Sequence, residues 1–244
     1  FSLGGETYHE GDWISLDGST GNVYGEAIKT VPAEIGGYFG RIMEWADEFR
    51  TMKVRTNADN PHDSKQAIEF GAEGIGLCRT EHMFFEKDRL PIVQQMILAE
   101  DEAVRSECLK KLEAVQQADF EGIFDVMAGK PVTVRLIDPP MHEFLPSFDE
   151  LLAETTALRT KIELGQTNLQ SELDTKMHLL HAVEGMRESN PMLGLRGVRL
   201  SIVFPGIVVM QTRAILQAAA KLIKQGKAVH PEIMIPLVGT VNEL

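Results

Sequence analysis

The sequence predicts an α/β fold, and two observations carry this prediction: strand-like and helix-like segments alternate, and helix-start signals lie between the strands. From residue 51 onwards, short apolar segments are separated by longer stretches whose apolar residues recur at helical spacing. Five segments have the length and composition of strands: residues 52–57, 74–78, 131–137, 193–202 and 232–238. Such an alternation implies parallel βαβ units. A doubly wound sheet and a (β/α)8 barrel both fit it, although a barrel needs eight strands.

Local signals place the helices. Asn60 followed by Pro61 supplies an N-cap and a first helical residue, so we expect a helix from there to about Phe70. Ser147 has Glu150 three residues later, which is the spacing of a capping box, and begins another helical region. The other expected helical segments are residues 91–128, in two or three pieces, 169–187 and 208–226.

The first part of the chain has a different character. Residues 12–25 read as two short strands around a polar turn that contains glycine. Because a lone hairpin is marginally stable in water, we expect this hairpin to be the end of a larger β-rich unit. Residues 33–49 contain a Gly-Gly pair and then an amphipathic run, which we interpret as a helical connector.

Composition narrows the class of protein. Of the 244 residues, 43% are hydrophobic and 25% are charged, and no apolar run reaches the roughly 18 residues of a membrane span. The formal net charge of −12 argues against nucleic acid or anionic lipid as the main partner. Two cysteines do not make a disulfide framework, so a cytoplasmic setting is expected.

Arginines recur in the strand-like segments or just after them. Arg79, Arg135 and Arg196 follow this pattern, and Arg135 interrupts an apolar strand. A buried guanidinium group is costly unless it is paired, and it cannot deprotonate. Since the carboxyl ends of parallel strands converge, we expect these three arginines to share an anionic ligand, a phosphate or a carboxylate. Any single arginine there is more often a surface residue or a salt-bridge partner, and we interpret Arg55 and Arg199 in this way.

Other reactive side chains have a simpler interpretation. Cys78 is expected to be a small buried residue, although the neighbouring Arg79 could lower the pKa of its thiol. His82 and His142 each stand beside a glutamate without a second histidine at metal-ligand spacing, so hydrogen-bonded structural roles are favoured. Asp138, followed by two prolines, is expected to leave its strand in a rigid conformation.

Three longer motifs together resemble one known family. They are GLCRTEHMF at residues 76–84, RLIDPPMHEFLP at residues 135–146 and NPMLGLRG at residues 190–197. In this order they resemble the phosphoenolpyruvate-utilising enzymes. The Asp-Pro-Pro followed by His-Glu-Phe-Leu-Pro resembles the pyruvate, phosphate dikinase branch of that family. The resemblance covers the chain from about Gly11 to its end.

The resemblance implies a fold and a domain organisation. The family's C-terminal domain is a (β/α)8 barrel that binds phosphoenolpyruvate or pyruvate with Mg²⁺, and it follows a swivelling domain that carries a phosphorylated histidine. About five of the eight barrel strands would lie in this chain, so we expect an incomplete barrel. The implied domains are a remnant of the phosphohistidine domain at residues 1–28, a helical connector at 29–50 and the first part of the barrel at 51–244.

The resemblance also implies an activity. Enzymes of that branch interconvert ATP, phosphate and pyruvate with AMP, diphosphate and phosphoenolpyruvate through the phosphohistidine. By motif match, Arg79, Arg135 and Arg196 correspond to arginines that bind the substrate. The implied partners are phosphoenolpyruvate or pyruvate, the phosphohistidine domain and a second copy in a homodimer. The expected location is the cytoplasm, or a plastid in a plant.

Some family features are not matched. The motifs of the carrier histidine, the Mg²⁺ ligands and the acid/base cysteine do not occur in this chain, and Cys78 is not that cysteine. We therefore assign no catalytic or metal-binding residue and expect a fragment that is inactive alone. Phosphoenolpyruvate synthase and enzyme I of the phosphotransferase system are alternatives within the family. A non-catalytic module for anion binding or oligomerisation is the alternative outside it.

Overall fold

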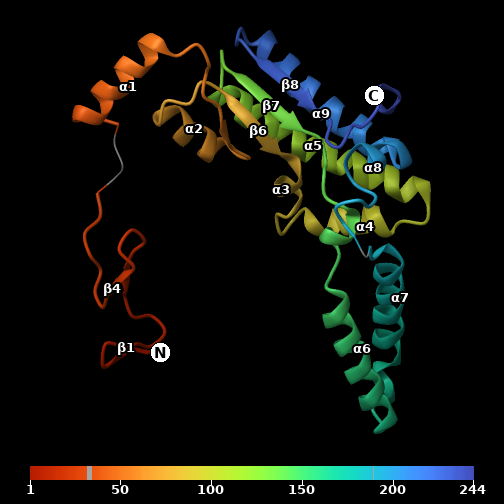
Figure 1. The fold of residues 1–244 in the computed structure, drawn as a ribbon. Coiled ribbons are helices and arrows are strands. Elements are labelled where there is room, and N and C mark those ends of the chain that lie inside the picture. The colour runs from red at the N-terminus through yellow and green to blue at the C-terminus, as the bar shows by residue number, and fades with distance from the viewer. Residues whose placement is uncertain (32–34, 189) are drawn as a thin grey trace. The chain divides into compact units, whose positions relative to one another are not determined.

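The computed structural model describes residues 1–31, 35–188 and 190–244 (Figure 1). The chain divides into two compact units, Phe1–Arg50 and Thr51–Leu244, and each is described here by itself. Residues 32–34, which belong to the expected connector, lie outside the described residues.

The first unit contains two hairpins and one helix. Strands β1 (Ser2–Leu3) and β2 (Glu6–Thr7) pair in antiparallel fashion, as do β3 (Ser15–Asp17) and β4 (Asn22–Tyr24). The second hairpin confirms the prediction for residues 12–25, whereas the first was not foreseen. Helix α1 (Gly37–Phe49) confirms the amphipathic helical run.

The second unit is built on a parallel sheet. Its strands are β5 (Thr56–Asn57), β6 (Ile75–Arg79), β7 (Pro131–Arg135) and β8 (His230–Met234). They lie in the order β5-β6-β7-β8, so neighbours along the chain are also neighbours in the sheet (Figure 1). Each described strand is therefore added at the same edge of the sheet, and the strand order does not reverse. Its first strand is shorter than the predicted segment 52–57.

One face of the sheet is covered by helices. Helices α2 (Pro61–Glu69), α5 (Glu102–Val126) and α9 (Pro205–Lys224) pack on it, and α5 and α9 lie side by side (Figure 1). The core between sheet and helices is made of fully buried apolar residues, among them Ile75, Val132, Val134, Phe120, Ile123 and Ile215. Burial of this surface is the main source of the unit's stability.

The opposite face of the sheet is polar. Thr133 alternates along β7 with the core residues Val132 and Val134, so it points away from the helices, and Glu232 is its partner in register on β8. Arg55 reaches across this face, where its Nη2 donates to Glu232 Oε1 at 3.2 Å. Thr133 Oγ1 donates to Glu232 Oε2 at 2.7 Å. This confirms the salt-bridge interpretation of Arg55.

A second apolar cluster forms beyond the carboxyl ends of the strands. It joins α3 (Thr80–Phe84), α4 (Leu90–Leu98), the 3-10 turn η1 (Met141–Phe144) and α8 (Gly197–Val203). In this cluster the ring of Phe144 stacks on that of Phe85, with 4.8 Å between ring centroids. These short elements hold the ends of the strands in place.

Two helices extend away from this cluster. Helix α6 (Phe148–Glu163), the 3-10 turn η2 (Thr167–Leu169) and helix α7 (Gln170–Met186) form a helical hairpin (Figure 1). The side chains of Asn60 and Ser147 cap α2 and α6 as the sequence predicts. A last 3-10 turn, η3, spans Val241–Glu243.

Helix α9 is the one described helix that is long and apolar enough to cross a membrane by length and composition. Its residues Ala214 and Ile215 are buried in the core between the helices and the sheet, and Ile207 is buried in the second apolar cluster. This is the arrangement of a core helix, so α9 does not indicate a membrane.

The predicted strand at residues 193–202 is wrong. Residues from Gly197 onwards form α8, and β7 pairs directly with β8, so four parallel strands are present in the described part of the chain instead of five. Short apolar runs are ambiguous between strand and helix. The φ angle of Gly197 is +56°, and a Cβ there would lie 2.9 Å from the Pro236 carbonyl oxygen. The chain therefore turns at a glycine.

We expect Phe120→Ala to lower the free energy of unfolding by about 3–5 kcal/mol, because the fully buried ring leaves a cavity in the core. Val104→Ala on the same helix is the control, since Val104 is 38% exposed and its loss should change stability by less than about 0.5 kcal/mol. Urea denaturation measures both values. Similar losses for the two variants would contradict this account of the core.

Candidate anion-binding site

Three arginines lie beyond the carboxyl end of the sheet. Arg79 ends β6 and Arg135 ends β7, and the two are paired in register on neighbouring strands. Arg196 comes from a different element, the residue that caps the start of α8. We call Arg79, Arg135 and Arg196 the arginine cluster.

Asp138 joins two members of the cluster. Its Oδ2 lies 3.0 Å from Arg135 Nη1 and 2.9 Å from Arg196 Nη2. Arg196 Nε also donates to the backbone carbonyl of Asp138 at 3.3 Å. Arg135 forms a further ion pair with Glu81. Strand β7 and the loop before α8 are thus tied together through one carboxylate.

Arg79 has a carboxylate partner of its own, Asp59. The Nη2 and Nε atoms of Arg79 donate to Asp59 Oδ2 at 2.7 and 3.1 Å, and its backbone N–H donates to Asp59 Oδ1 at 2.6 Å. These hydrogen bonds raise the pKa of Arg79. His82 Nδ1 lies 3.0 Å from the same carboxylate, which agrees with a hydrogen-bonded structural role for this histidine.

The cluster is balanced by its carboxylates. Three arginines face Asp59, Glu81 and Asp138, so their formal charges cancel. Some buried atoms nevertheless have no hydrogen-bond partner among the described residues: Arg135 Nε, Glu81 Oε2 and Asp138 Oδ1. Unpaired buried polar atoms are rare in proteins, and they concentrate here at the site the sequence pointed to.

A buried relay of hydrogen bonds fixes the backbone at Arg135. Thr80 Oγ1 donates to the Arg135 carbonyl at 2.9 Å, and Gln211 Nε2 donates to Thr80 Oγ1 at 2.9 Å. Gln211 Oε1 accepts from the Ile137 N–H at 2.9 Å. Gln211 lies on α9 and is fully buried, so this helix fixes the ends of β6 and β7 through one amide.

The structure brings together part of what the sequence predicted. Arg135 and Arg196 share a carboxylate, whereas Arg79 is next to Arg135 in the sheet but pairs separately with Asp59. Glu81, which follows Arg79 by two residues, pairs with Arg135 on the neighbouring strand. Arg199 Nη1 donates to the backbone carbonyls of Leu193 and Gly194, so this arginine supports the local backbone.

Sequence reasoning missed two residues of this arrangement. Asp59 lies two residues after the end of β5, and that position was the available signal. Gln211 gave no signal, because a glutamine inside a helical stripe reads as a surface residue until the helix is packed.

The two cysteines are buried. Burial raises the pKa of the Cys78 thiol, and this effect outweighs the opposing influence of Arg79. The interpretation of Cys78 as a small core residue is therefore confirmed. His142 differs from the expectation of a hydrogen-bonded histidine, because its buried Nδ1 has no partner among the described residues.

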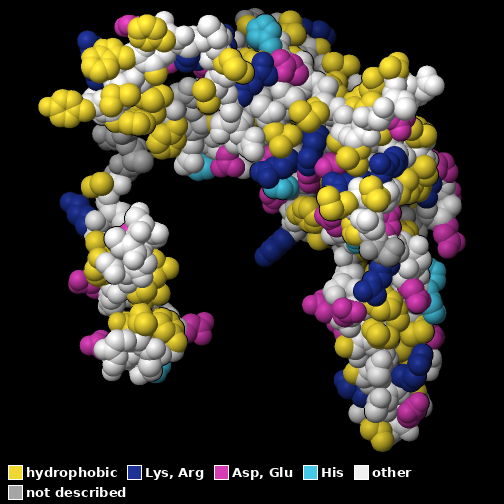
Figure 2. Space-filling model, in the orientation of Figure 1, with side chains coloured by type: hydrophobic (Ala, Val, Ile, Leu, Met, Phe, Trp, Pro, Cys, Tyr) yellow, Lys and Arg dark blue, Asp and Glu magenta, His cyan; other side chains and the backbone are white. Residues whose placement is uncertain are grey.

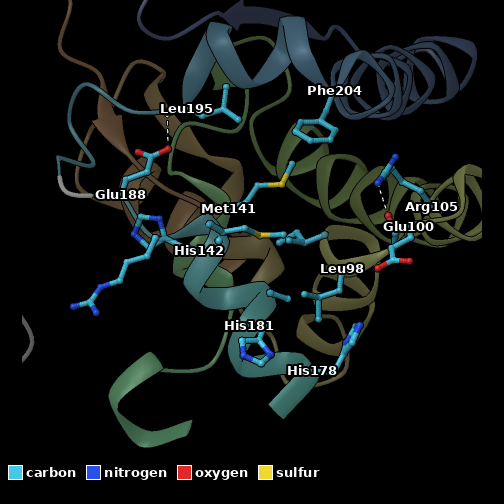
Figure 3. Close-up of a pocket in the computed structure, with 16 residues that line it drawn as sticks. Leu98, Glu100, Arg105, Met141, His142, His178, His181, Glu188, Leu195 and Phe204 are labelled. Carbon is cyan, nitrogen blue, oxygen red and sulfur yellow. Dashed lines mark hydrogen bonds between the residues drawn. The ribbon is translucent and has the colours of Figure 1, made fainter. Parts of the chain in front are cut away.

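A cavity of about 700 Å³ is lined by residues of α4, η1, α7 and the segment before α8 (Figure 3). None of the three arginines lines it. Its wall includes Leu98, Met141, His142, Met186, Leu195 and Phe204. Figure 2 shows basic and acidic side chains interspersed on the visible face of this unit. Within residues 1–31, 35–188 and 190–244, no three His, Cys, Asp or Glu side chains are grouped to hold a metal ion.

Comparison with known proteins identifies similar sequences. Residues 34–244 match the family described as PEP-utilising enzyme, PEP-binding domain. The chain is 49% identical to pyruvate, phosphate dikinase of Clostridium symbiosum, in a match that covers 100% of this chain and 26% of that protein. The dikinase of Rhizobium meliloti is 50% identical, with coverages of 98% and 25%. The chloroplastic dikinase of Mesembryanthemum crystallinum is 46% identical, with coverages of 99% and 24%. The chain spans about a quarter of the length of these curated relatives.

We expect Gln211→Leu to lower the free energy of unfolding by about 1–3 kcal/mol, because the Ile137 N–H loses its buried acceptor. Gln217→Leu on the exposed side of α9 is the matched control and should be close to neutral. Urea denaturation compares the two. A Gln211→Leu protein as stable as the unchanged chain would rule out the relay as a support of the site.

Proposed function

This chain belongs to the family of PEP-utilising enzymes, and we propose that its arginine cluster binds the phosphoryl and carboxylate groups of phosphoenolpyruvate or pyruvate. The observation that carries this proposal is the shared carboxylate of Asp138, which holds Arg135 and Arg196 together at the end of the strand next to Arg79. The substrate class follows from the family, and the residues follow from the geometry.

The unit built on residues 51–244 is, in this proposal, the first part of a (β/α)8 barrel. Two features support it: the strands follow one another without a reversal of order, and the described helices that pack on the sheet cover the same face. A doubly wound sheet would have helices on both faces. We assign residues 1–28 to the end of the phosphohistidine domain and residues 29–50 to a connector.

The guanidinium groups are pre-oriented for an anion. Each carries five N–H donors in a rigid fork, and the carboxylates use only some of them. Asp59 accepts from Nε and Nη2 of Arg79, and Asp138 accepts from the same two atoms of Arg196. The Nη1 atom of each arginine therefore has no partner among the described residues. Both side chains are partly exposed, at 36% and 22%. These N–H groups are free to meet a ligand.

Such an arrangement acts by position and charge. Donors that are already held in place stabilise negative charge without first reorganising, and this lowers the barrier of a phosphoryl transfer. In our proposal the cluster neutralises the phosphoryl oxygens, while Asp59, Glu81 and Asp138 prevent the arginines from following the ligand when it moves.

The chain would perform this binding as part of a pyruvate, phosphate dikinase. That enzyme interconverts ATP, phosphate and pyruvate with AMP, diphosphate and phosphoenolpyruvate, and the barrel would exchange the phosphoryl group with the phosphohistidine domain. The high identity to dikinases from bacteria and a plant supports this assignment. We further propose that this dikinase is a homodimer and that it is located in the cytoplasm, or in a plastid if the source is a plant.

Family membership implies Mg²⁺, which would stabilise the enolate of pyruvate when bound. The residues described here do not fit it. The carboxylates nearest the cluster each face one or two arginines, and no group of three metal-binding side chains occurs in the described ranges. We therefore derive no step of the reaction through the metal.

We expect Arg79→Ala, Arg135→Ala and Arg196→Ala each to weaken phosphoenolpyruvate binding about 10- to 100-fold, because each removes charge-assisted hydrogen bonds to the anion. Isothermal titration calorimetry of the chain gives the dissociation constants.

Arg213→Ala is the matched control for these variants. Arg213 lies on α9, is 54% exposed and pairs with Glu113, away from the cluster. Its removal should leave the affinity unchanged. Binding that survives Arg135→Ala would count against the proposed site.

We expect the 244-residue chain by itself to show no dikinase turnover, because it matches about a quarter of its relatives and carries none of the motifs for the carrier histidine, metal ligands or acid/base cysteine. A coupled assay for phosphoenolpyruvate formation checks this, with the dikinase of Clostridium symbiosum as the positive control. Phosphoenolpyruvate formed by the chain alone would overturn the expectation.

A further inference from the structure

We propose that Glu188 is a positioning residue for Arg196, which it holds in place by fixing the loop between α7 and α8. This inference rests on the proposed role of Arg196 in substrate binding. Glu188 lies two residues beyond the end of α7, and Figure 3 shows its carboxylate directed at the backbone of Leu195.

The first observation is a hydrogen bond to the residue next to Arg196. Glu188 Oε1 accepts from the Leu195 N–H at 2.7 Å. A bond from a carboxylate to a backbone N–H is charge-assisted and therefore stronger than a bond between neutral groups. It fixes the peptide unit immediately before Arg196.

The second observation is the fit of the carboxylate against Gly194. A Cβ atom at Gly194 would lie 1.3 Å from Glu188 Oε2 and 2.2 Å from the carboxyl carbon. The carboxylate thus occupies the space that a side chain at position 194 would need. A side chain at this position would therefore displace the carboxylate of Glu188.

The third observation is the exposure of much of the loop. Glu188 and Leu195 border the cavity of about 700 Å³, and of the loop's apolar side chains Leu195 packs against the second apolar cluster. Met192 and Leu193 are 76% and 74% exposed. Three sets of side-chain hydrogen bonds hold this segment: the Leu195 N–H donates to Glu188, Arg199 donates to the carbonyls of Leu193 and Gly194, and Arg196 donates to Asp138.

The fourth observation is an unpaired atom. Glu188 Oε2 is buried and has no hydrogen-bond partner among the described residues. A carboxylate buried with one oxygen unpaired is costly for stability. A role in holding the substrate loop explains why an acidic residue stands here in place of an apolar one.

The experiment uses three variants of the 244-residue chain and one control. Glu188→Ala removes the acceptor, Glu188→Gln keeps an oxygen that can accept from Leu195, and Gly194→Ala pushes the carboxylate out of its place. Glu184→Gln is the matched control, because Glu184 is an exposed residue one turn earlier on α7. Circular dichroism and urea denaturation verify that each variant is folded.

The first readout is hydrogen exchange of the segment 190–199, and it requires no ligand. We expect the Leu195 amide to exchange about tenfold faster in Glu188→Ala and in Gly194→Ala, and to keep its protection in Glu188→Gln and in the control. In the double variant Glu188→Ala/Gly194→Ala, the alanine at 194 should add no further effect, since the atoms it would displace are gone. Unchanged exchange in Glu188→Ala would refute the anchoring role.

The second readout is the dissociation constant of phosphoenolpyruvate. Glu188→Ala should weaken binding about tenfold in the unchanged background and have no effect in the Arg196→Ala background, because Glu188 acts through Arg196. A residue that acted only by its negative charge would behave in the opposite way: both Glu188→Ala and Glu188→Gln would strengthen binding of an anion.

The two proposals fail in different ways. If Arg196→Ala leaves the affinity unchanged, or if the unchanged chain does not bind phosphoenolpyruvate, the proposed function of the cluster fails, while the exchange data still decide whether Glu188 holds the loop. If Arg196→Ala weakens binding and Glu188→Ala does not, the positioning role of Glu188 is wrong and the cluster stands.

Discussion

The bridge of Asp138 between Arg135 and Arg196 is the interaction on which the geometry of the site depends. A guanidinium group cannot lose its charge at neutral pH, so a partly buried arginine must have a partner or be expelled to solvent. One carboxylate meets that requirement for two arginines from separate segments. The two prolines after Asp138 restrict its backbone conformation, and this restricts the position of its carboxylate as well.

The position of this bridge depends on the sheet, which separates the apolar core from the charged side chains. Helices α2, α5 and α9 bury the apolar side of the strands, and the charged side chains gather on the other side and at the strand ends. Gln211 is the exception that links the two regions, since it lies in the apolar helix α9 and reaches the polar end of the sheet. A rigid core thereby fixes the backbone from which Arg79 and Arg135 project.

The sequence was informative wherever a feature is local. Asn60 and Ser147 predict the starts of their helices because a cap is an interaction within one helical turn. The alternation of strand-like and helix-like segments predicts parallel strands. The segment from Leu193 to Ile202 was misread, since the turn at Gly197 is imposed by the close approach of Pro236, which is distant in sequence. For the same reason the partner of Arg79 was not foreseen: Asp59 is brought to it only by the pairing of β5 with β6.

The cancellation of formal charge in the arginine cluster has a consequence for how a ligand arrives. A site without net charge exerts little attraction beyond about 8–10 Å at physiological ionic strength, and the chain as a whole carries −12. A doubly negative ligand is therefore not steered over long distances, and the protein's overall field opposes its approach. Diffusional encounter should become faster as added salt screens that field, which is the reverse of the behaviour of enzymes that draw their substrates in with an excess of positive charge.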